Sequence, residues 1–354
     1  MNANKWYLFN VDKQQRAQTF FGTLDELLLE GTPEEDPGGH TALLNSLRTP
    51  CLPREVDEWL SAGGETRQHS PLAWLPVELL DMVLDELLMR DVIMFAITCK
   101  SLLITTKRRV LAVLKALHAP WQNGRLILLG MDGTYRRADL PTGLFNDAEW
   151  QRIATTPPPQ AHRGVLVQSA RVLDIWGLAR YEMTLGGRDS LYHLRRRVPT
   201  TLRPIRGPSY GQWNTPSGGV SAKRSDGPSD FRMFSMLWGC AGVAYPEGAR
   251  VLCNISKGEY IREDTLTVAR DTDATLAHAL LARIAWSTQL SVTVQCSEWA
   301  KAEVKHGPWA GDRFCVATMD SLPVLGRGVG PWTDVTEAVD RLLRDLKGVA
   351  VATS

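Results

Sequence analysis

Few residues in this sequence have the types and spacing of a catalytic site. The segment 207–211, Gly-Pro-Ser-Tyr-Gly, matches the pattern of a nucleophile elbow, in which a serine hydroxyl attacks a carbonyl carbon. That chemistry needs a buried strand before the serine and a helix after it, whereas proline and arginine surround Ser209. The glycines of segment 326–330 likewise lack the strand–helix setting of a dinucleotide-binding loop. We expect neither segment to transform a substrate.

The histidines and cysteines do not follow the spacing of a metal site. The seven histidines include no HExxH pattern and no pair four residues apart, and the six cysteines are scattered without a CxxC pair. Thiolate and imidazole ligands need such spacing to converge on one ion. We therefore expect reduced thiols, no metal, no cofactor and no enzymatic activity.

The composition is that of a globular protein without an electrostatic partner. The chain has 354 residues, of which 44% are hydrophobic and 22% charged, with a formal net charge of +1. No apolar run approaches the roughly 18 residues of a membrane span, and the N-terminus has no apolar signal segment. We expect a cytoplasmic or nuclear protein that binds no membrane. Nucleic-acid binding is not expected, because the Arg195–Arg197 run fits a solvated linker better than a basic contact surface.

Helices are predicted for residues 71–118, where apolar residues recur at helical spacing. Ser70 can cap the first helix and Pro71 can occupy its first turn. Strands are predicted around Trp6–Asn10, Arg125–Gly130, Val251–Ile261 and Arg313–Ala317, and an amphipathic helix over Val335–Leu346.

Two passages share one order of features, which predicts an internal repeat. Each has Asn-x-x-Lys after a strand, then Pro-Trp followed by a strand that begins with arginine, and then Leu-Pro. The matching tryptophans are Trp121 and Trp309. If the repeat is real, the helical block interrupts its first copy; the alternative is a chance similarity between strand–turn motifs.

The helical block resembles an F-box. Leu75-Pro76, Glu78-Leu79, the spaced apolar residues after them and Thr98-Cys99-Lys100 follow the pattern of that family, although Ser101-Leu102-Leu103 stand where a tryptophan is common. F-boxes are small helical modules that dock on the Skp adaptor of cullin–RING ubiquitin ligases. With Trp6–Lys13, Gly307–Arg313 and Trp332–Thr336, the chain is similar to fungal F-box-like proteins of uncharacterised function.

The resemblance implies the function of a substrate receptor in a cullin–RING ligase of the SCF type. Its partners would be a Skp-type adaptor, through it a cullin, and a client protein of unknown identity. The expected adaptor-binding residues lie along one helical stripe: Leu75, Pro76, Leu79, Val83 and Leu87. The alternative is a non-enzymatic binding or scaffold protein whose F-box-like hairpin is internal core. That alternative requires Leu79 and Val83 to be inaccessible.

A second candidate site lies in the second repeat copy. Asp312 and Arg313 beside Trp309 could line a client or ligand cleft, although a turn with a local ion pair is the simpler interpretation.

The predicted fold class is α+β, with two similar α+β units of which the first is interrupted by a small helical F-box-like insertion. The expected parts are the split first unit at 1–30 and 119–187, an acidic flexible connection at 31–70, the helical module at 71–118, a basic disordered linker at 188–232, and the second unit at 233–348.

Overall fold

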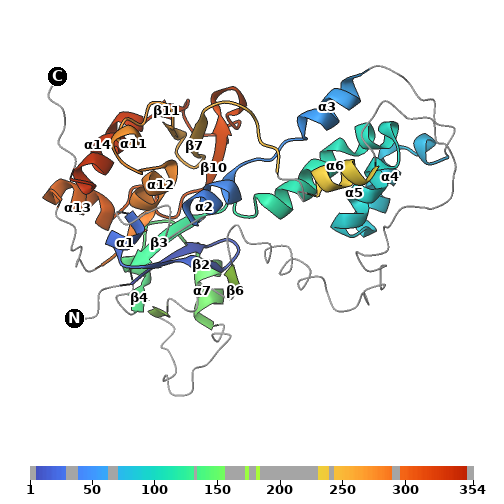
Figure 1. Cartoon of the computed structure of the whole chain (residues 1–354). Helices are drawn as coiled ribbons and strands as arrows, with labels where there is room; N and C mark the ends of the chain where they lie inside the picture. The colour runs from blue at the N-terminus through green and yellow to red at the C-terminus, as the bar shows by residue number, and fades with distance from the viewer. Residues whose placement is uncertain are drawn as a thin grey trace. The chain divides into compact units, whose positions relative to one another are not determined.

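The structure is a computed structural model, and its α+β class agrees with the prediction (Figure 1). It describes residues 5–28, 39–62, 71–130, 134–155, 172–174, 181–183, 230–238, 243–288 and 296–348. The chain divides into two compact units. The α+β unit contains residues 1–49, 119–187 and 246–354, and the helical unit contains residues 50–118 and 188–245. The predicted linker falls almost entirely outside the described residues, as does the Gly-Pro-Ser-Tyr-Gly segment.

The first repeat copy forms the centre of a five-stranded sheet. Its strand order is β6 (Tyr181–Met183), β2 (Gln15–Gly22), β1 (Trp6–Asn10), β3 (Leu126–Gly130) and β9 (Ala285–Trp286). Strand β1 is antiparallel to both β2 and β3, while β6 and β9 join the two edges in parallel. A two-stranded ladder of β4 (Thr134–Arg136) and β5 (Val172–Asp174) is separate from this sheet.

The second copy builds a four-stranded sheet on the same plan. Its order is β10 (Phe314–Thr318), β7 (Arg250–Asn254), β8 (Glu259–Arg262) and β11 (Thr333–Asp334). Strand β7 is antiparallel to both neighbours, as β1 is in the first copy, and β11 is parallel to β8 as β6 is to β2. The internal repeat predicted from the sequence is therefore real.

Equivalent side chains make equivalent hydrogen bonds in the two copies. The backbone N–H of Lys13 donates to Asn10 Oδ1 over 3.0 Å, and that of Lys257 donates to Asn254 Oδ1 over 3.2 Å. Each matching tryptophan donates its indole N–H to the first residue of the hairpin's second strand. The pairs are Trp121 with Gln15 and Trp309 with Glu259.

Each copy pairs with the sheet of the other after a helix. Helix α2 (Gly39–Leu47) of the first copy is followed by Arg48, which forms an isolated parallel bridge to Val316 in the sheet of the second copy. Helix α12 (Leu276–Ile284) of the second copy runs into β9, which pairs in parallel with β3 of the first. The two copies, predicted as two similar units, lie in one compact body.

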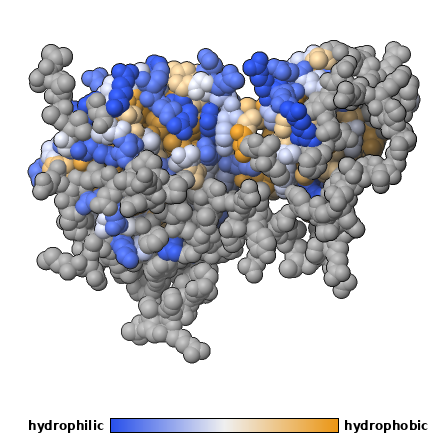
Figure 2. All heavy atoms as spheres, in the orientation of Figure 1, coloured by the Kyte–Doolittle hydropathy of each residue, from blue (hydrophilic) through white to orange (hydrophobic). Residues whose placement is uncertain are grey.

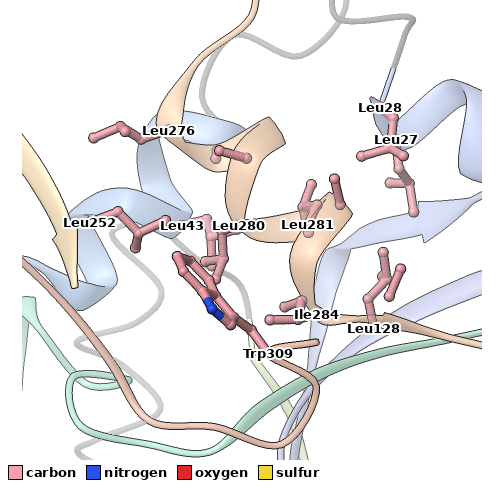
Figure 3. Close-up of a cluster of buried hydrophobic side chains, with 14 of the residues drawn as sticks. Leu27, Leu28, Leu43, Leu128, Leu252, Leu276, Leu280, Leu281, Ile284 and Trp309 are labelled. Carbon is pink, nitrogen blue, oxygen red and sulfur yellow. The ribbon is translucent and has the colours of Figure 1, made fainter. Parts of the chain in front are cut away.

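Both copies contribute to one hydrophobic core. Trp309 is fully buried against Leu43 of α2 and Leu280 of α12 (Figure 3). Leu128 of β3 and Leu252 of β7 bring both sheets to the same cluster (Figure 3). A tryptophan buries about 150–250 Å² and so anchors such a junction.

Further helices belong to the same unit. They are α1 (Leu24–Leu28), α7 (Asp147–Thr155), α11 (Val268–Asp271), α13 (Glu298–Lys305) and α14 (Thr336–Leu346). Helix α14 buries Val339, Leu342, Leu343 and Leu346, as the predicted amphipathic pattern requires.

The prediction of a flexible connection over residues 31–70 is wrong where the structure describes it. Helix α2 buries Leu43, Leu44 and Leu47 in the shared core, and α3 (Arg54–Ser61) buries Val56 in the helical unit. A helical turn near Val56–Leu60 was expected within this connection and lies in α3, whereas α2 was not expected. Tertiary burial stabilises helices too short to be stable alone.

The helical unit is built on three consecutive helices within residues 71–118, the range predicted to be helical. After a 3₁₀ turn at Pro71–Trp74 come α4 (Val77–Glu86), α5 (Met89–Ile97) and α6 (Lys100–His118). Helix α10 (Asp230–Leu237) completes the core with Met233 and Leu237, although residues from 233 onward were predicted as α+β. Helix α10 packs against α5 although the two helices lie far apart in the sequence, so the sequence order does not reveal this contact.

Candidate docking surface on the helical unit

Helix α4 presents different apolar residues to its own core and to solvent. It starts after Pro76, whose carbonyl oxygen accepts hydrogen bonds from Leu79 N and Leu80 N, both over 3.1 Å. Leu80 and Leu84 are buried, and they pack in the two small cores of the helical unit. Their spacing of four residues places them on one face of the helix. The remaining apolar residues of α4 therefore point elsewhere.

The predicted adaptor-binding residues divide into two groups. Leu79 and Val83 are 45% and 43% exposed, and Pro76 is exposed at the start of the helix. These three residues lie along one outer stripe, since they are three and four positions apart. Leu75 and Leu87 are half-buried and pack against the cores of the helical unit. Leu75 and Leu87 therefore lie at the two ends of the stripe and are less exposed than the residues between them.

The exposed apolar surface is larger than the sequence indicated. Trp74 is 77% exposed, and Met82 is exposed beside Leu79 and Val83. Among the described residues, twelve large hydrophobic side chains are exposed, and nine of them belong to the helical unit: Leu72, Trp74, Val77, Leu79, Met82, Val83, Leu88, Met89 and Ile104. On α4, Leu79, Met82 and Val83 are out of step with the buried Leu80 and Leu84, but the spacing alone does not show which of the two sets faces the core.

Such a concentration distinguishes the helical unit from the rest of the described surface. On the face drawn in Figure 2, hydrophilic and neutral residues cover most of the described surface. Single exposed apolar residues are ordinary, whereas a group of them on one element marks an interaction site. We call Leu79, Met82, Val83 and the preceding Trp74 the α4 stripe.

Trp309, Asp312 and Arg313 lie together, but they do not surround an open cleft. Trp309 is fully buried in the shared core, and its indole N–H donates to Glu259. The Asp312 carboxylate accepts a 2.8 Å hydrogen bond from Asn254 Nδ2 and lies 3.6 Å from Lys257 Nζ. Burial raises the pKa of Asp312, and both neighbours oppose that shift.

Arg313 has a different environment from its neighbours. Its guanidinium donates to Asp12 and to the carbonyl oxygen of Asn123, both over 2.7 Å, across the contact between the two copies. A hollow of about 250 Å³ lies elsewhere, along residues 137–145. The three residues thus hold the turn before β10 and the junction of the copies.

The described residues include no metal cluster and no membrane span. Among them, no group of three or more histidine, cysteine, aspartate or glutamate side chains is placed to hold a metal ion. No helix in the described part of the chain is long and apolar enough to cross a membrane.

Comparisons with protein-family models, with curated proteins and with solved structures find no match to this chain.

Proposed function

We propose that this protein is an F-box substrate receptor of a cullin–RING ubiquitin ligase, with the α4 stripe as its Skp-adaptor contact. The observation that carries the proposal is the outward exposure of Leu79 and Val83 on a helix whose inner face is already filled by Leu80 and Leu84. In such an assembly the α+β unit would contact a client protein, and ubiquitin transfer would belong to other subunits.

The energetics of the stripe suit a helix-in-groove contact. Complete burial of a leucine, valine or methionine side chain contributes roughly 1.5–3 kcal/mol, and Trp74 offers a larger area. Interfaces concentrate their binding energy in a few such anchors, so two truncations are sufficient to test the contact. The stripe supplies three aliphatic anchors and one aromatic residue at its N-terminal end.

The internal-core alternative is less well supported. A scaffold whose hairpin is merely core would bury Leu79 and Val83, and both are open to solvent in the described chain. Under that alternative, their replacement would unfold the helical unit instead of releasing a partner.

The experiment compares residues on the outer and inner faces of the same helix. We expect the double variant Leu79→Ala, Val83→Ala to keep its fold and to bind a recombinant fungal Skp adaptor at least about 30-fold more weakly, as measured by calorimetry. Leu84→Ala should instead destabilise the helical unit by about 2–5 kcal/mol.

Ile104→Ala is the matched surface control. Ile104 is an exposed aliphatic residue of α6 outside the stripe, so its truncation should leave adaptor binding unchanged. The proposal fails if the wild-type chain does not bind the adaptor at micromolar concentration. It also fails if the double variant binds as tightly as the wild type.

A further inference from the structure

Helix α4 carries only acidic charge. Its sequence, Val-Glu-Leu-Leu-Asp-Met-Val-Leu-Asp-Glu, has four carboxylates and no basic residue. Glu78 and Asp81 are three residues apart, and Asp81 and Asp85 are four apart, so like charges face each other along the helix. Asp85 and Glu86 also stand in the last turn, where the helix dipole disfavours negative charge. These charges weaken α4 as an isolated helix.

Some acidic side chains of the described helical unit form ion pairs and others do not. The three acids of α3 are ion-paired, Glu55 with Arg232, Asp57 with Lys107 and Glu58 with Arg54, and Asp85 of α4 pairs with Arg109. In contrast, Glu78, Asp81 and Glu86 are exposed and have no ion pair within the described chain.

Two of the three unpaired acids border the α4 stripe, and the third lies farther round the same flank. At 100° per residue, Glu86 falls between Met82 and Leu79 on the outer face, Glu78 lies next to Met82, and Asp81 lies beyond Glu78. A partner helix or groove that covers the stripe would therefore meet these carboxylates at its rim. Charged rims of this kind set association rate and specificity more than final affinity.

We infer that the surface docking on the α4 stripe is an apolar groove with basic residues along its rim. The inference rests on the proposed function, and it states the chemistry of the adaptor face that α4 would contact. Lysine or arginine on that face would neutralise Glu78, Asp81 and Glu86, which the chain itself leaves uncompensated. The self-repulsion of α4 would then be relieved on binding, so docking and helix stability would be coupled.

The test combines neutralisation with salt titration on the full chain. The triple variant Glu78→Gln, Asp81→Asn, Glu86→Gln keeps the shape of the side chains and removes the charge. With the recombinant Skp adaptor at 50 mM salt, we expect it to associate about tenfold more slowly than the wild type. Raising the salt to 500 mM should slow the wild type by a similar factor and leave the variant nearly unchanged.

A matched control neutralises three acids that already have partners. The variant Glu55→Gln, Asp57→Asn, Glu58→Gln removes the same charge from α3 and should associate at the wild-type rate. The inference is overturned if the α4 variant binds as fast as the wild type, if it binds faster, or if the α3 variant is slowed equally. Each of these results leaves adaptor binding itself intact, whereas absence of wild-type binding would reject the proposed function.

Discussion

At the scale of single residues, one group of partly buried charged side chains lies where the two copies of the α+β unit meet. Arg125 is largely buried and donates to Asp12 over 2.6 Å and to Glu149 over 2.7 Å. Burial acts to lower the pKa of Arg125, but the two carboxylates outweigh it and raise that pKa overall. The equivalent Arg313 shares Asp12 from the opposite copy. A single carboxylate thus joins equivalent arginines of the repeat.

A buried histidine pair forms a second junction between the copies. The ring centroids of His40 on α2 and His278 on α12 are 4.2 Å apart. His278 Nδ1 accepts a 3.0 Å hydrogen bond from the backbone N–H of Thr275, which caps α12. Burial is the main cause that lowers the pKa of His278 to about 3, with repulsion from His40 and Lys347 adding to it and Asp273 opposing it.

We predict that acid destabilises the α+β unit through His278. In the unfolded chain the pKa of histidine is about 6.5, so between pH 6.5 and 3 the unfolded state binds the extra proton and stability falls as the pH falls. The loss at pH 5 relative to pH 7.5 should be about 2 kcal/mol from this group. Denaturant titrations followed by hydrogen exchange in α12 would measure it.

His278→Gln provides the comparison for this prediction. Glutamine at this position can still accept the Thr275 N–H, as in an ordinary capping box, and it does not titrate. The free energy of unfolding is measured against pH for both proteins. The difference between the two slopes gives the contribution of His278, because the carboxylates titrate in both proteins. Equal slopes for wild type and variant would contradict the prediction.

The sequence indicated which residues of the candidate docking surface lie along one stripe, but it indicated their orientation only in part. The Leu-Pro start and the helical spacing predicted a stripe with Leu79 and Val83, and the structure exposes both; their contact with an adaptor stays a prediction. Periodicity alone does not decide which side of a short amphipathic helix faces the core, and so Trp74 and Met82 were missed. Trp309 was ambiguous for a related reason, because tryptophan suits cores and contact surfaces equally.

At the scale of elements, α10 is a necessary part of the helical unit despite its distance in sequence. It packs on α5, and Phe234 and Trp238 stack with ring centroids 5.9 Å apart. Arg90 of α5 lies over the Phe234 ring at 5.9 Å. The hydrophobic core of the helical unit therefore includes residues from a segment that begins at residue 230.

We predict that truncation inside α10 destabilises the helical unit. Leu237 is fully buried in the same cluster as Leu84 and Ile93, so Leu237→Ala should reduce the free energy of unfolding by about 2–5 kcal/mol. Arg232→Ala removes an exposed ion pair with Glu55 and should cost less than about 1 kcal/mol. Hydrogen exchange in α5 and α6 would report both, and equal effects would show that α10 is not part of this core.

Elements with a strong local pattern were predicted well, and elements stabilised mainly by distant contacts were not. Strands β1, β3, β7 and β10 have continuous apolar runs that are buried, and all four were expected. Helix α2 has only nine residues within a polar, Gly-rich stretch, and its stability comes from burial beneath both sheets. No local signal reports a partner that lies more than 200 residues away, such as α12.

At the scale of the whole α+β unit, the repeat is intertwined and not merely tandem. The isolated bridge between Arg125 and Arg313 joins equivalent residues, and β9 of the second copy forms an edge strand of the first copy's sheet. Trp121 and Trp309 are buried in one cluster to which both copies contribute. The two similar sequences therefore share one hydrophobic core.

We predict that the chain divided between Tyr245 and Pro246 reassembles from its two pieces. This division keeps the helical unit and the first copy together in fragment 1–245 and leaves the second copy in fragment 246–354. Each fragment alone should aggregate, because α2, β3, α12 and β9 would expose the faces that form the shared core. Co-expressed, they should elute as a 1:1 complex in size-exclusion chromatography at micromolar concentration. Leu43→Asp places a charge against Trp309 and should abolish the complex, while Trp299→Ala on the exposed side of α13 should not. A folded, monomeric fragment 246–354 would instead mean that the second copy folds independently and that its contacts with the first copy add little to its stability.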